Sequence, residues 1–272
     1  MSEHLAFEVT GAAGRTLRTS AILPETPRGT VIICHGFKGF SQWGFFPHLA
    51  GAIANEGIRA IRFDFSGSGV GADGESFTDA DAFAENTFSR ELEDLAAIEA
   101  EAKRQGWIEA PYGLVGHSRG GGTAILHAAG NPAVGALVAL AAIAYVRRWS
   151  EAEERDWRAR GYTEVVNSRT GQVLRLGTAL LDDVEAGADG RLDIQAAASR
   201  MKAPWLIIHG DADSSVSVDD AHRLADAAPD ARLLIIEGAS HTFDVVHPMR
   251  DSSPALDLAV SETTEWMRRE LT

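Results

Sequence analysis

Cysteine is nearly absent from this sequence of 272 residues, which contains only Cys34. A single cysteine excludes an internal disulfide and any zinc site built from several cysteines. Cys34 follows the apolar run Thr30–Ile33, so we expect a small buried residue at the end of a strand. No pair of histidines has metal-ligand spacing beside a carboxylate, and we therefore expect no metal site.

Positive charge and long apolar runs are also scarce. The chain has 25 lysines and arginines against 39 aspartates and glutamates, which gives a formal net charge of −14. This balance argues against a nucleic acid or an anionic membrane as a partner. The alanine-rich segment Gly135–Val146 is too short to cross a membrane, and the N-terminal residues lack the pattern of a secretory signal. We therefore expect a cytoplasmic protein, and both a monomer and a homodimer stay open.

The sequence does contain many hydrophobic residues, arranged in short runs. They make up 45% of the chain, enough for a large α/β domain. Apolar runs alternate with helical patterns, which is typical of a mostly parallel sheet with helices on both faces. We predict eight strands, at Leu5–Val9, Leu17–Leu23, Thr30–Cys34, Ile58–Phe65, Tyr112–Val115, Ala136–Ile143, Trp205–His209 and Ala231–Glu237. Helices are predicted at Phe46–Glu56, Glu85–Gln105, Thr123–Ala129, Val218–Ala228 and Leu256–Leu271.

The segment 145–200 breaks this alternation. It is charged and irregular, with an amphipathic helix predicted at Arg147–Arg160 and a small hairpin at Glu164–Leu176. A stretch of this length without sheet strands is typical of a functional insertion. We therefore predict that residues 1–144 and 201–272 form the core and that residues 145–200 form a lid.

Two glycine-rich turns invite comparison with phosphate-binding loops. A P-loop requires a lysine after its glycines, and the turn that begins at Gly116 has none. The segment Gly69–Gly74 matches the G-x-G-x-x-G pattern of dinucleotide-binding proteins, but the acidic stretch Glu75–Ala82 follows it in place of a helix. We therefore expect no cofactor, and we expect Gly69–Gly74 to form a loop near the rim of an active site.

The same turn fits a nucleophilic serine better. Its residues Gly116-His117-Ser118-Arg119-Gly120 match the pattern G-x-S-x-G. A predicted strand precedes the motif and a helical pattern follows it, as required when a serine is presented on a strained turn. The alternative is an ordinary glycine-rich turn between a strand and a helix. Ser118 is the candidate nucleophile.

A nucleophilic serine needs a base. His241 follows the last predicted strand and is the best-placed histidine. His247, further along the same loop, is the alternative base. His117 precedes the serine, and we expect its side chain to point elsewhere.

The base in turn needs an acid that orients it. Asp213 follows the strand Trp205–His209, at the edge of the sheet where open α/β proteins place their sites. We expect Asp211, earlier in this turn, to accept hydrogen bonds from the backbone of its own turn. The resulting order is Ser118, Asp213, His241, which is the chain order of α/β-hydrolases.

An oxyanion hole would complete such a site. It needs the backbone N–H of the residue after the nucleophile and a second N–H from the loop after an earlier strand. Arg119 is the residue after Ser118, and the loop His35–Gly39 follows an early strand. The candidate donors are therefore the N–H groups of Phe37 and Arg119.

Four segments together resemble the α/β-hydrolase superfamily over essentially the whole chain: His35–Phe37, Gly116–Gly121, His209–Asp213 and Gly238–Phe243. The first segment and the mid-sized insertion are similar to the bacterial carboxylesterases that include feruloyl (cinnamoyl) esterases. The resemblance implies an α/β-hydrolase fold that cleaves carboxylic esters of small or aromatic acids through an acyl-enzyme intermediate. A thioesterase, a serine peptidase and a slow ligand-sensing protein of the same fold remain alternatives.

Aromatic residues give the only indication of the substrate. Trp43 and Phe45 follow the predicted oxyanion loop, and Trp157 and Tyr162 lie in the predicted lid. They are candidates for an apolar pocket that binds a small-molecule ester. The alternative is that they hold the lid against the core.

Overall fold

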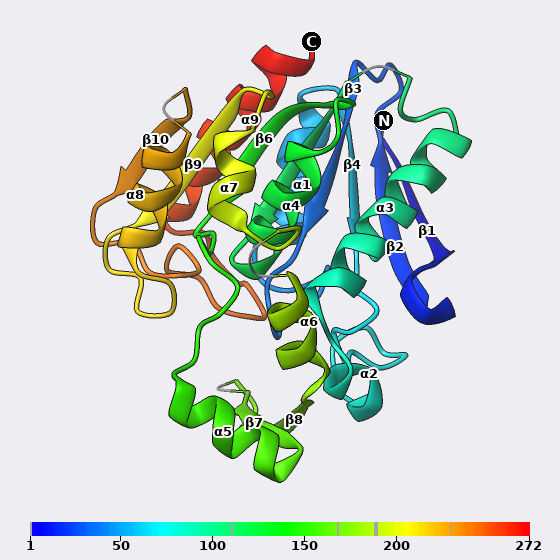
Figure 1. The fold of residues 1–272 in the computed structure, drawn as a ribbon. Helices are drawn as coiled ribbons and strands as arrows, with labels where there is room; N and C mark the ends of the chain where they lie inside the picture. The colour runs from blue at the N-terminus through cyan, green and yellow to red at the C-terminus, as the bar shows by residue number, and fades with distance from the viewer. Residues whose placement is uncertain (1, 110, 168, 188–189, 229) are drawn as a thin grey trace.

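The computed structural model describes residues 2–109, 111–167, 169–187, 190–228 and 230–272. Within these residues the chain forms a sheet of eight strands in the order β1-β2-β4-β3-β5-β6-β9-β10 (Figure 1). The strands are β1 (Glu3–Thr10), β2 (Thr16–Leu23), β3 (Gly29–Cys34), β4 (Ile58–Phe63), β5 (Tyr112–His117), β6 (Val134–Leu140), β9 (Trp205–Gly210) and β10 (Arg232–Ile236). Strand β2 pairs antiparallel with β1 and β4, and the other neighbours are parallel. Each strand overlaps its predicted range, and the predicted fold class is confirmed.

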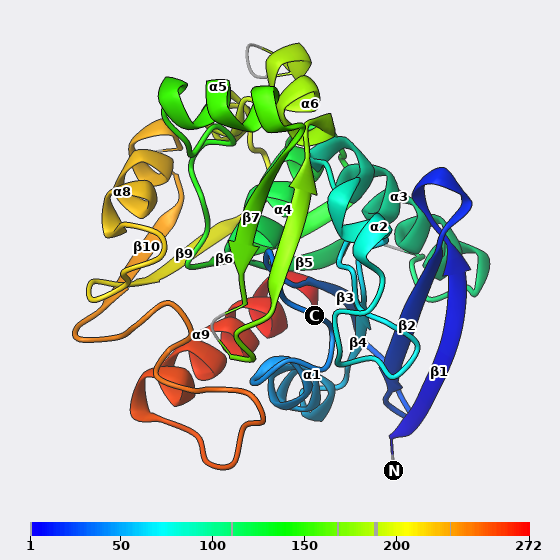
Figure 2. The same ribbon diagram turned by 90° about the horizontal axis from the view of Figure 1, so that it is seen from below.

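Helices cover both faces of the sheet (Figures 1 and 2). One face packs against α3 (Phe88–Arg104), α4 (Arg119–Ala129), α7 (Ile194–Ser199) and α8 (Val218–Ala227), and the other against α1 (Phe46–Asn55) and α9 (Pro254–Leu271). Successive strand residues alternate between the faces, so Ile32 and Leu114 contact the first layer while Val31 and Val115 contact the second. Because both faces are covered, the central strands β3 and β5 are buried almost throughout and mostly apolar.

The helix boundaries follow local chemistry. The predicted helix at Glu85–Gln105 begins only at Phe88, because the Thr87 side chain caps it by accepting the backbone N–H of Arg90. Ser253 caps α9 in the same way, and Pro254 follows it at the first helical position. No helix in the described ranges is long and apolar enough to span a membrane.

An insertion separates β6 from α7. It contains α5 (Glu151–Arg160), β7 (Tyr162–Val166), β8 (Val173–Gly177) and α6 (Ala179–Gly187). Strands β7 and β8 pair antiparallel in a sheet of their own, so the predicted helix and hairpin are both present. The insertion lies beyond one end of the main sheet in Figure 1, and Figure 2 shows the hairpin in front of the central strands. Helix α7 also falls within the predicted lid, but it packs against α4 and α8 of the core layer. The extent of a lid stays a prediction.

A short 3-10 turn, η1 (Ala12–Gly14), joins β1 to β2.

The glycine pattern Gly69–Gly74 lies in an irregular loop between β4 and the short helix α2 (Ala80–Ala84). Later in the glycine loop, the carbonyl oxygens of Glu75 and Phe77 accept hydrogen bonds from Arg169 and Gln172, at 3.3 and 2.7 Å. The loop therefore supports the turn of the β7–β8 hairpin.

Candidate active site

Ser118 lies on a tight turn between β5 and α4. Its backbone has φ 56° and ψ −122°, a conformation that L-residues rarely adopt. A Cβ atom on Gly116 would clash with the carbonyl oxygen of Gly120, and one on Gly120 would clash with that of His35. Only glycine therefore allows strand and helix to approach closely enough to hold the serine in this conformation.

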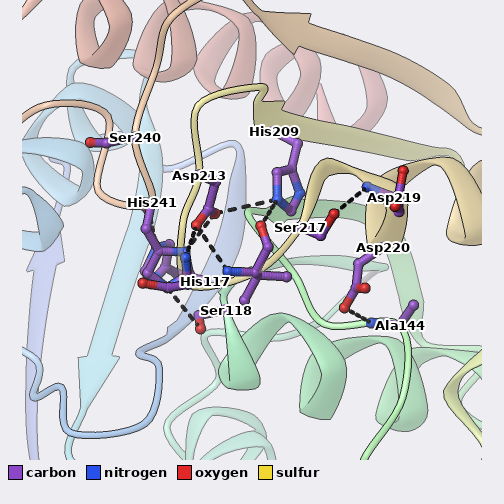
Figure 3. A network of polar contacts seen from close by, with 12 residues as sticks. His117, Ser118, Ala144, His209, Asp213, Ser217, Asp219, Asp220, Ser240 and His241 are labelled. Atoms are coloured by element: carbon purple, nitrogen blue, oxygen red, sulfur yellow. Dashed lines mark hydrogen bonds and ion pairs between the residues drawn. The ribbon is translucent and has the colours of Figure 1, made fainter. Parts of the chain in front are cut away.

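The structure brings the three candidate catalytic side chains together in one hydrogen-bonded chain (Figure 3). The His241 Nε2 atom lies 3.0 Å from Ser118 Oγ, and its Nδ1 atom lies 2.7 Å from Asp213 Oδ2. An ionised carboxylate only accepts, so Nδ1 carries the proton and Nε2 is free to accept the serine hydroxyl proton. The three residues follow β5, β9 and β10, at the same edge of the sheet.

The alternative base, His247, makes no such contact. Its Nδ1 atom accepts the backbone N–H of Gly44 at 2.9 Å, and its ring lies against Phe40 and Trp43. The tertiary structure therefore separates two histidines that the sequence places in one loop.

Asp213 is held by its own turn. Its Oδ1 atom accepts the backbone N–H groups of Ser215 and Val216, at 2.8 and 2.9 Å. Burial alone raises the pKa of this carboxyl, but hydrogen bonds from His209, His241 and the Val216 N–H outweigh it and hold the pKa below its usual range. Asp213 is therefore ionised at neutral pH.

The role expected for Asp211 is wrong. The Asp211 carboxylate accepts the backbone N–H of Gly238 at 2.6 Å, in the turn after β10. It thus ties the strand end that carries the acid to the loop that carries the base. The bonds to the turn's own backbone belong to Asp213, because its side chain points back over residues 215 and 216.

His117 does not point away from the site. Its Nε2 atom lies 2.9 Å from the carbonyl oxygen of His241, and the two rings are 4.7 Å apart. Burial, together with the charge of His241, lowers the pKa of His117 to about 3. His117 is therefore neutral and donates its Nε2 proton to the backbone of the candidate base. Sequence reasoning missed this contact because it joins residues far apart in the chain.

The predicted oxyanion loop passes directly against the serine. A Cβ atom on Gly36 would lie 2.9 Å from Ser118 Cβ, and the Gly39 N–H closes the loop on the Gly36 carbonyl at 3.0 Å. The N–H of Arg119 belongs to the first residue of α4, where a backbone N–H has no partner within the helix. Phe37 and Arg119 both line the cavity that contains Ser118.

The side chain of Arg119 fixes this loop. Its Nε atom lies 2.8 Å from Glu91 Oε1 on α3, and both groups are buried. Its guanidinium stacks on the rings of Phe88 and Phe37, at 4.0 and 5.3 Å. The Thr123 hydroxyl donates to the other oxygen of Glu91 at 2.8 Å. The sequence indicates that Glu91 needs a buried partner, because Glu91 falls on the apolar face of its helix. The sequence pattern does not show that this partner is Arg119.

The site opens into a cavity of about 800 Å³. Of the predicted pocket residues, Trp43 and Trp157 line it. Trp149, another aromatic residue of the predicted lid, also lines it, whereas sequence reasoning missed the aliphatic lining residues Ile143, Val146, Leu176 and Leu180. The cavity therefore has walls from both the core and the insertion.

Two predicted pocket residues were wrong. Phe45 is fully buried and packs against Phe46, His117 and Phe243, beneath the serine turn. Tyr162 begins strand β7, whose alternate residues Thr163 and Val165 line the cavity. Because neighbouring strand residues point to opposite sides, Tyr162 faces away and lies between the guanidinium groups of Arg160 and Arg175, at 4.9 and 4.3 Å.

Part of the chain matches the model of a known protein family. Residues 25–168, more than half of the chain, match the Hydrolase_4 family, described as serine aminopeptidase, S33. The chain belongs to this family. The protein is an α/β hydrolase, as its fold and the resemblance noted in the sequence both indicate. No curated protein matches the hydrolase closely enough to count as a relative.

Solved structures share the fold of the hydrolase. Est1E from Butyrivibrio proteoclasticus with ferulic acid bound is 21% identical, with 96% of this chain and 98% of that chain covered and a TM-score of 0.72. The esterase domain of a Rhodothermus marinus protein is 19% identical, with 99% and 100% covered and a TM-score of 0.70. The monoacylglycerol lipase of Paleococcus ferrophilus is 18% identical, with 93% and 99% covered and a TM-score of 0.70. At these identities the likeness shows the fold alone.

Proposed function

We propose that this hydrolase cleaves carboxylic esters through an acyl-enzyme intermediate. The observation that carries the proposal is the hydrogen-bonded chain from Ser118 Oγ through His241 to Asp213, with its serine at the wall of the cavity. A hydroxyl bonded to a neutral imidazole, itself bonded to a buried carboxylate, is an activated nucleophile.

The reaction follows from the protonation states. The Ser118 oxygen attacks the ester carbonyl carbon while His241 Nε2 takes the serine proton. Asp213 stays ionised and stabilises the imidazolium, and the N–H groups of Phe37 and Arg119 stabilise the oxyanion. The bond from the carbonyl carbon to the alcohol oxygen then breaks as His241 returns the proton to the alcohol. Water repeats the sequence on the acyl-enzyme and releases the acid.

A peptidase is the second candidate, because the family description names an aminopeptidase. An aminopeptidase has to bind the positively charged amino group of its substrate, and a carboxylate is the natural partner of that group. Within the described part of the chain, no aspartate or glutamate lines the cavity. This favours an ester over an aminopeptide. A thioester remains compatible with the same residues.

The experiment is a panel of matched acyl esters, thioesters and aminoacyl amides, assayed with the wild type and Ser118→Ala. We expect the ester to have the highest kcat/KM and Ser118→Ala to lower it by about 10⁴-fold or more. A fluorophosphonate should label the wild type and not the variant. Activity retained by the variant would overturn the assignment of Ser118, and binding without turnover of any substrate would favour a ligand-sensing protein.

A further inference from the structure

The charged residues that line the cavity are all cationic in the described part of the chain. They are Lys38, Arg119, Arg148 and Arg169. This is unexpected in a protein whose formal net charge is −14. The long-range field of such a chain repels an anion. Cations at the site therefore act at short range, on a group bound in the cavity or on the residues that form its wall.

Two of the four cations are already neutralised. Arg119 is paired with Glu91 at 2.8 Å, and Arg148 with Asp220 at 2.7 Å. Both carboxylates are buried behind the cavity wall. Arg119 and Arg148 therefore support the structure of the wall and do not require a charged ligand.

Among the described residues, the other two cations donate hydrogen bonds only to backbone carbonyl oxygens. The Lys38 ammonium donates to the carbonyl oxygen of Val166 at 3.1 Å, and Arg169 donates to that of Glu75 at 3.3 Å. Neither forms an ion pair with a carboxylate among the described residues. Burial lowers the pKa of Lys38, as expected for a partly buried ammonium.

Lys38 and Arg169 belong to one end of the cavity. Lys38 follows Phe37 in the oxyanion loop and contacts the last residue of β7, and Arg169 lies in the turn that β7 enters. The guanidinium of Arg169 is 5.9 Å from the ring of Phe40, which contacts the ring of His247 at 5.0 Å.

His247 adds a neutral donor to this end. Its Nδ1 atom accepts the N–H of Gly44, so in the neutral ring Nε2 carries the proton. His247 lines the cavity, and burial and the charge of Arg169 both lower its pKa, so it stays neutral near this guanidinium. An ammonium, a guanidinium and an imidazole N–H together match the acceptor oxygens of a carboxylate.

A second group of lining residues is apolar. Trp149 and Trp157 contact each other at 5.3 Å between ring centres, and Leu176 and Leu180 belong to the same hydrophobic cluster. The cavity of about 800 Å³ is large enough for a substrate with both an apolar group and a charged group.

We propose that the substrates of this site are esters that carry a carboxylate, which Lys38 and Arg169 bind while the tryptophan and leucine side chains bind the apolar part. The inference rests on the proposed esterase function. It does not depend on whether the carboxylate belongs to the acid or to the alcohol of the ester.

The test uses two pairs of esters that differ only in charge. On the acid side, the 4-nitrophenyl monoester of glutaric acid is compared with the same ester of glutaric monoamide. On the alcohol side, the acetyl ester of 4-hydroxybenzoate is compared with that of 4-hydroxybenzamide. We expect the anionic member of at least one pair to have a kcat/KM at least about tenfold higher, as for one charge-assisted hydrogen bond. The pair that shows the preference identifies the side that carries the charge.

Variants assign the preference to the two cations. Arg169→Gln and Lys38→Gln should each lower the ratio of anionic to neutral kcat/KM toward one, and Arg169→Lys should restore part of it. Arg175→Gln is the matched control, because Arg175 lies on the same hairpin but contacts Glu164 and Tyr162 outside the cavity. The control should keep the wild-type ratio.

The outcomes separate the two proposals. Neutral esters cleaved as well as anionic ones, with full dependence on Ser118, overturn the inference and leave the esterase function intact. An anionic preference that persists in both Gln variants, or that Arg175→Gln lowers equally, also overturns it. No Ser118-dependent cleavage of any of the four esters overturns the esterase function, and the inference with it.

Discussion

The candidate catalytic residues Ser118 and His241 and the insertion border the same cavity, but different forces hold them. Ser118 and Asp213 follow the fully buried strands β5 and β9, and His241 follows the partly buried edge strand β10. A buried ion pair, Arg119 with Glu91, braces the serine turn from behind. In helix α5 of the insertion, Trp157 is the buried residue. The ion pairs of this helix, such as Arg158 with Asp182, lie on the surface.

This difference between the core and the insertion indicates that the core positions the reacting atoms and that the insertion selects the substrate. Packing on both faces restrains the strand ends, so the reacting atoms keep their distances. The insertion contributes walls through a few anchors and exposed charges, which screen easily and contribute little stability. We therefore expect changes in the core to abolish the reaction or the fold, and changes in the insertion to alter which ester reacts.

The strongest test of this contrast concerns the base. His241→Ala should lower kcat by about 10⁴-fold or more, because it removes both the proton acceptor and the contact with Asp213. His247→Ala should lower kcat by far less, since His247 lines the cavity without contacting the serine. Steady-state kinetics on a 4-nitrophenyl ester measures both variants. The reverse order would assign the base to His247.

Ion pairs offer the next test. Arg119→Met leaves Glu91 buried without its partner, so the free energy of unfolding should fall by about 3–5 kcal/mol. Arg158→Met removes a surface cation of the insertion, and no measurable loss is expected. Urea unfolding compares the two variants, and Arg119→Met with Glu91→Leu should recover much of the loss. Equal losses of unfolding free energy in Arg119→Met and Arg158→Met would contradict the view that only the core depends on buried ion pairs.

Removal of the insertion tests its proposed role as a lid. Replacing residues 147–190 with a short glycine-serine linker removes Trp149, Trp157 and Leu180 from the cavity wall. The kcat/KM for aromatic esters should fall by about 10- to 100-fold, as when a hydrophobic pocket is lost. Fluorophosphonate labelling of Ser118 should persist. Loss of labelling in a protein that is still folded would show that the segment belongs to the core.

A further test concerns acid stability, which depends on buried groups of the core. The pKa of His117 lies near 3 in the folded protein against an ordinary value of 6.5. Between these values the unfolded state binds more protons, so the free energy of unfolding falls on acidification by up to about 1.4 kcal/mol per pH unit. Urea unfolding between pH 4 and about 7 should show a smaller loss in His117→Gln than in the wild type. An identical pH dependence would contradict the assignment.

Asp94 provides the matched control of opposite sign. Burial raises its pKa to about 6 from 3.8, despite hydrogen bonds from the N–H groups of Ala12 and Ser66. The folded state therefore binds more protons between these values, which adds stability as the pH falls below 6. Asp94→Asn should accordingly lose more stability on acidification than the wild type.

Much of the core was predictable because its signals are local. Apolar runs predicted all eight strands of the main sheet, and the glycine pattern around Ser118 predicted the tight turn. Acidic and basic residues at strand ends predicted a common edge, and Asp213 and His241 do meet there. These inferences succeed because strand periodicity and turn chemistry depend on neighbouring residues.

The contacts of the insertion were less predictable. Its helix and hairpin are recognisable, but the side of β7 that faces the cavity depends on how the hairpin lies on the core, so Tyr162 was assigned to the wrong side. The same reason applies to Phe45, which is adjacent in sequence to residues near the cavity yet lies beneath the serine turn.

By itself, the sequence determined the order of strands and helices along the chain and the three residue types of the candidate triad. Only the tertiary structure decided between His241 and His247, turned His117 toward the backbone of the base, and gathered Lys38 and Arg169 at one end of the cavity. Each of these outcomes joins segments far apart in the chain. Their distances depend on sheet order and on packing between layers, which no local pattern records.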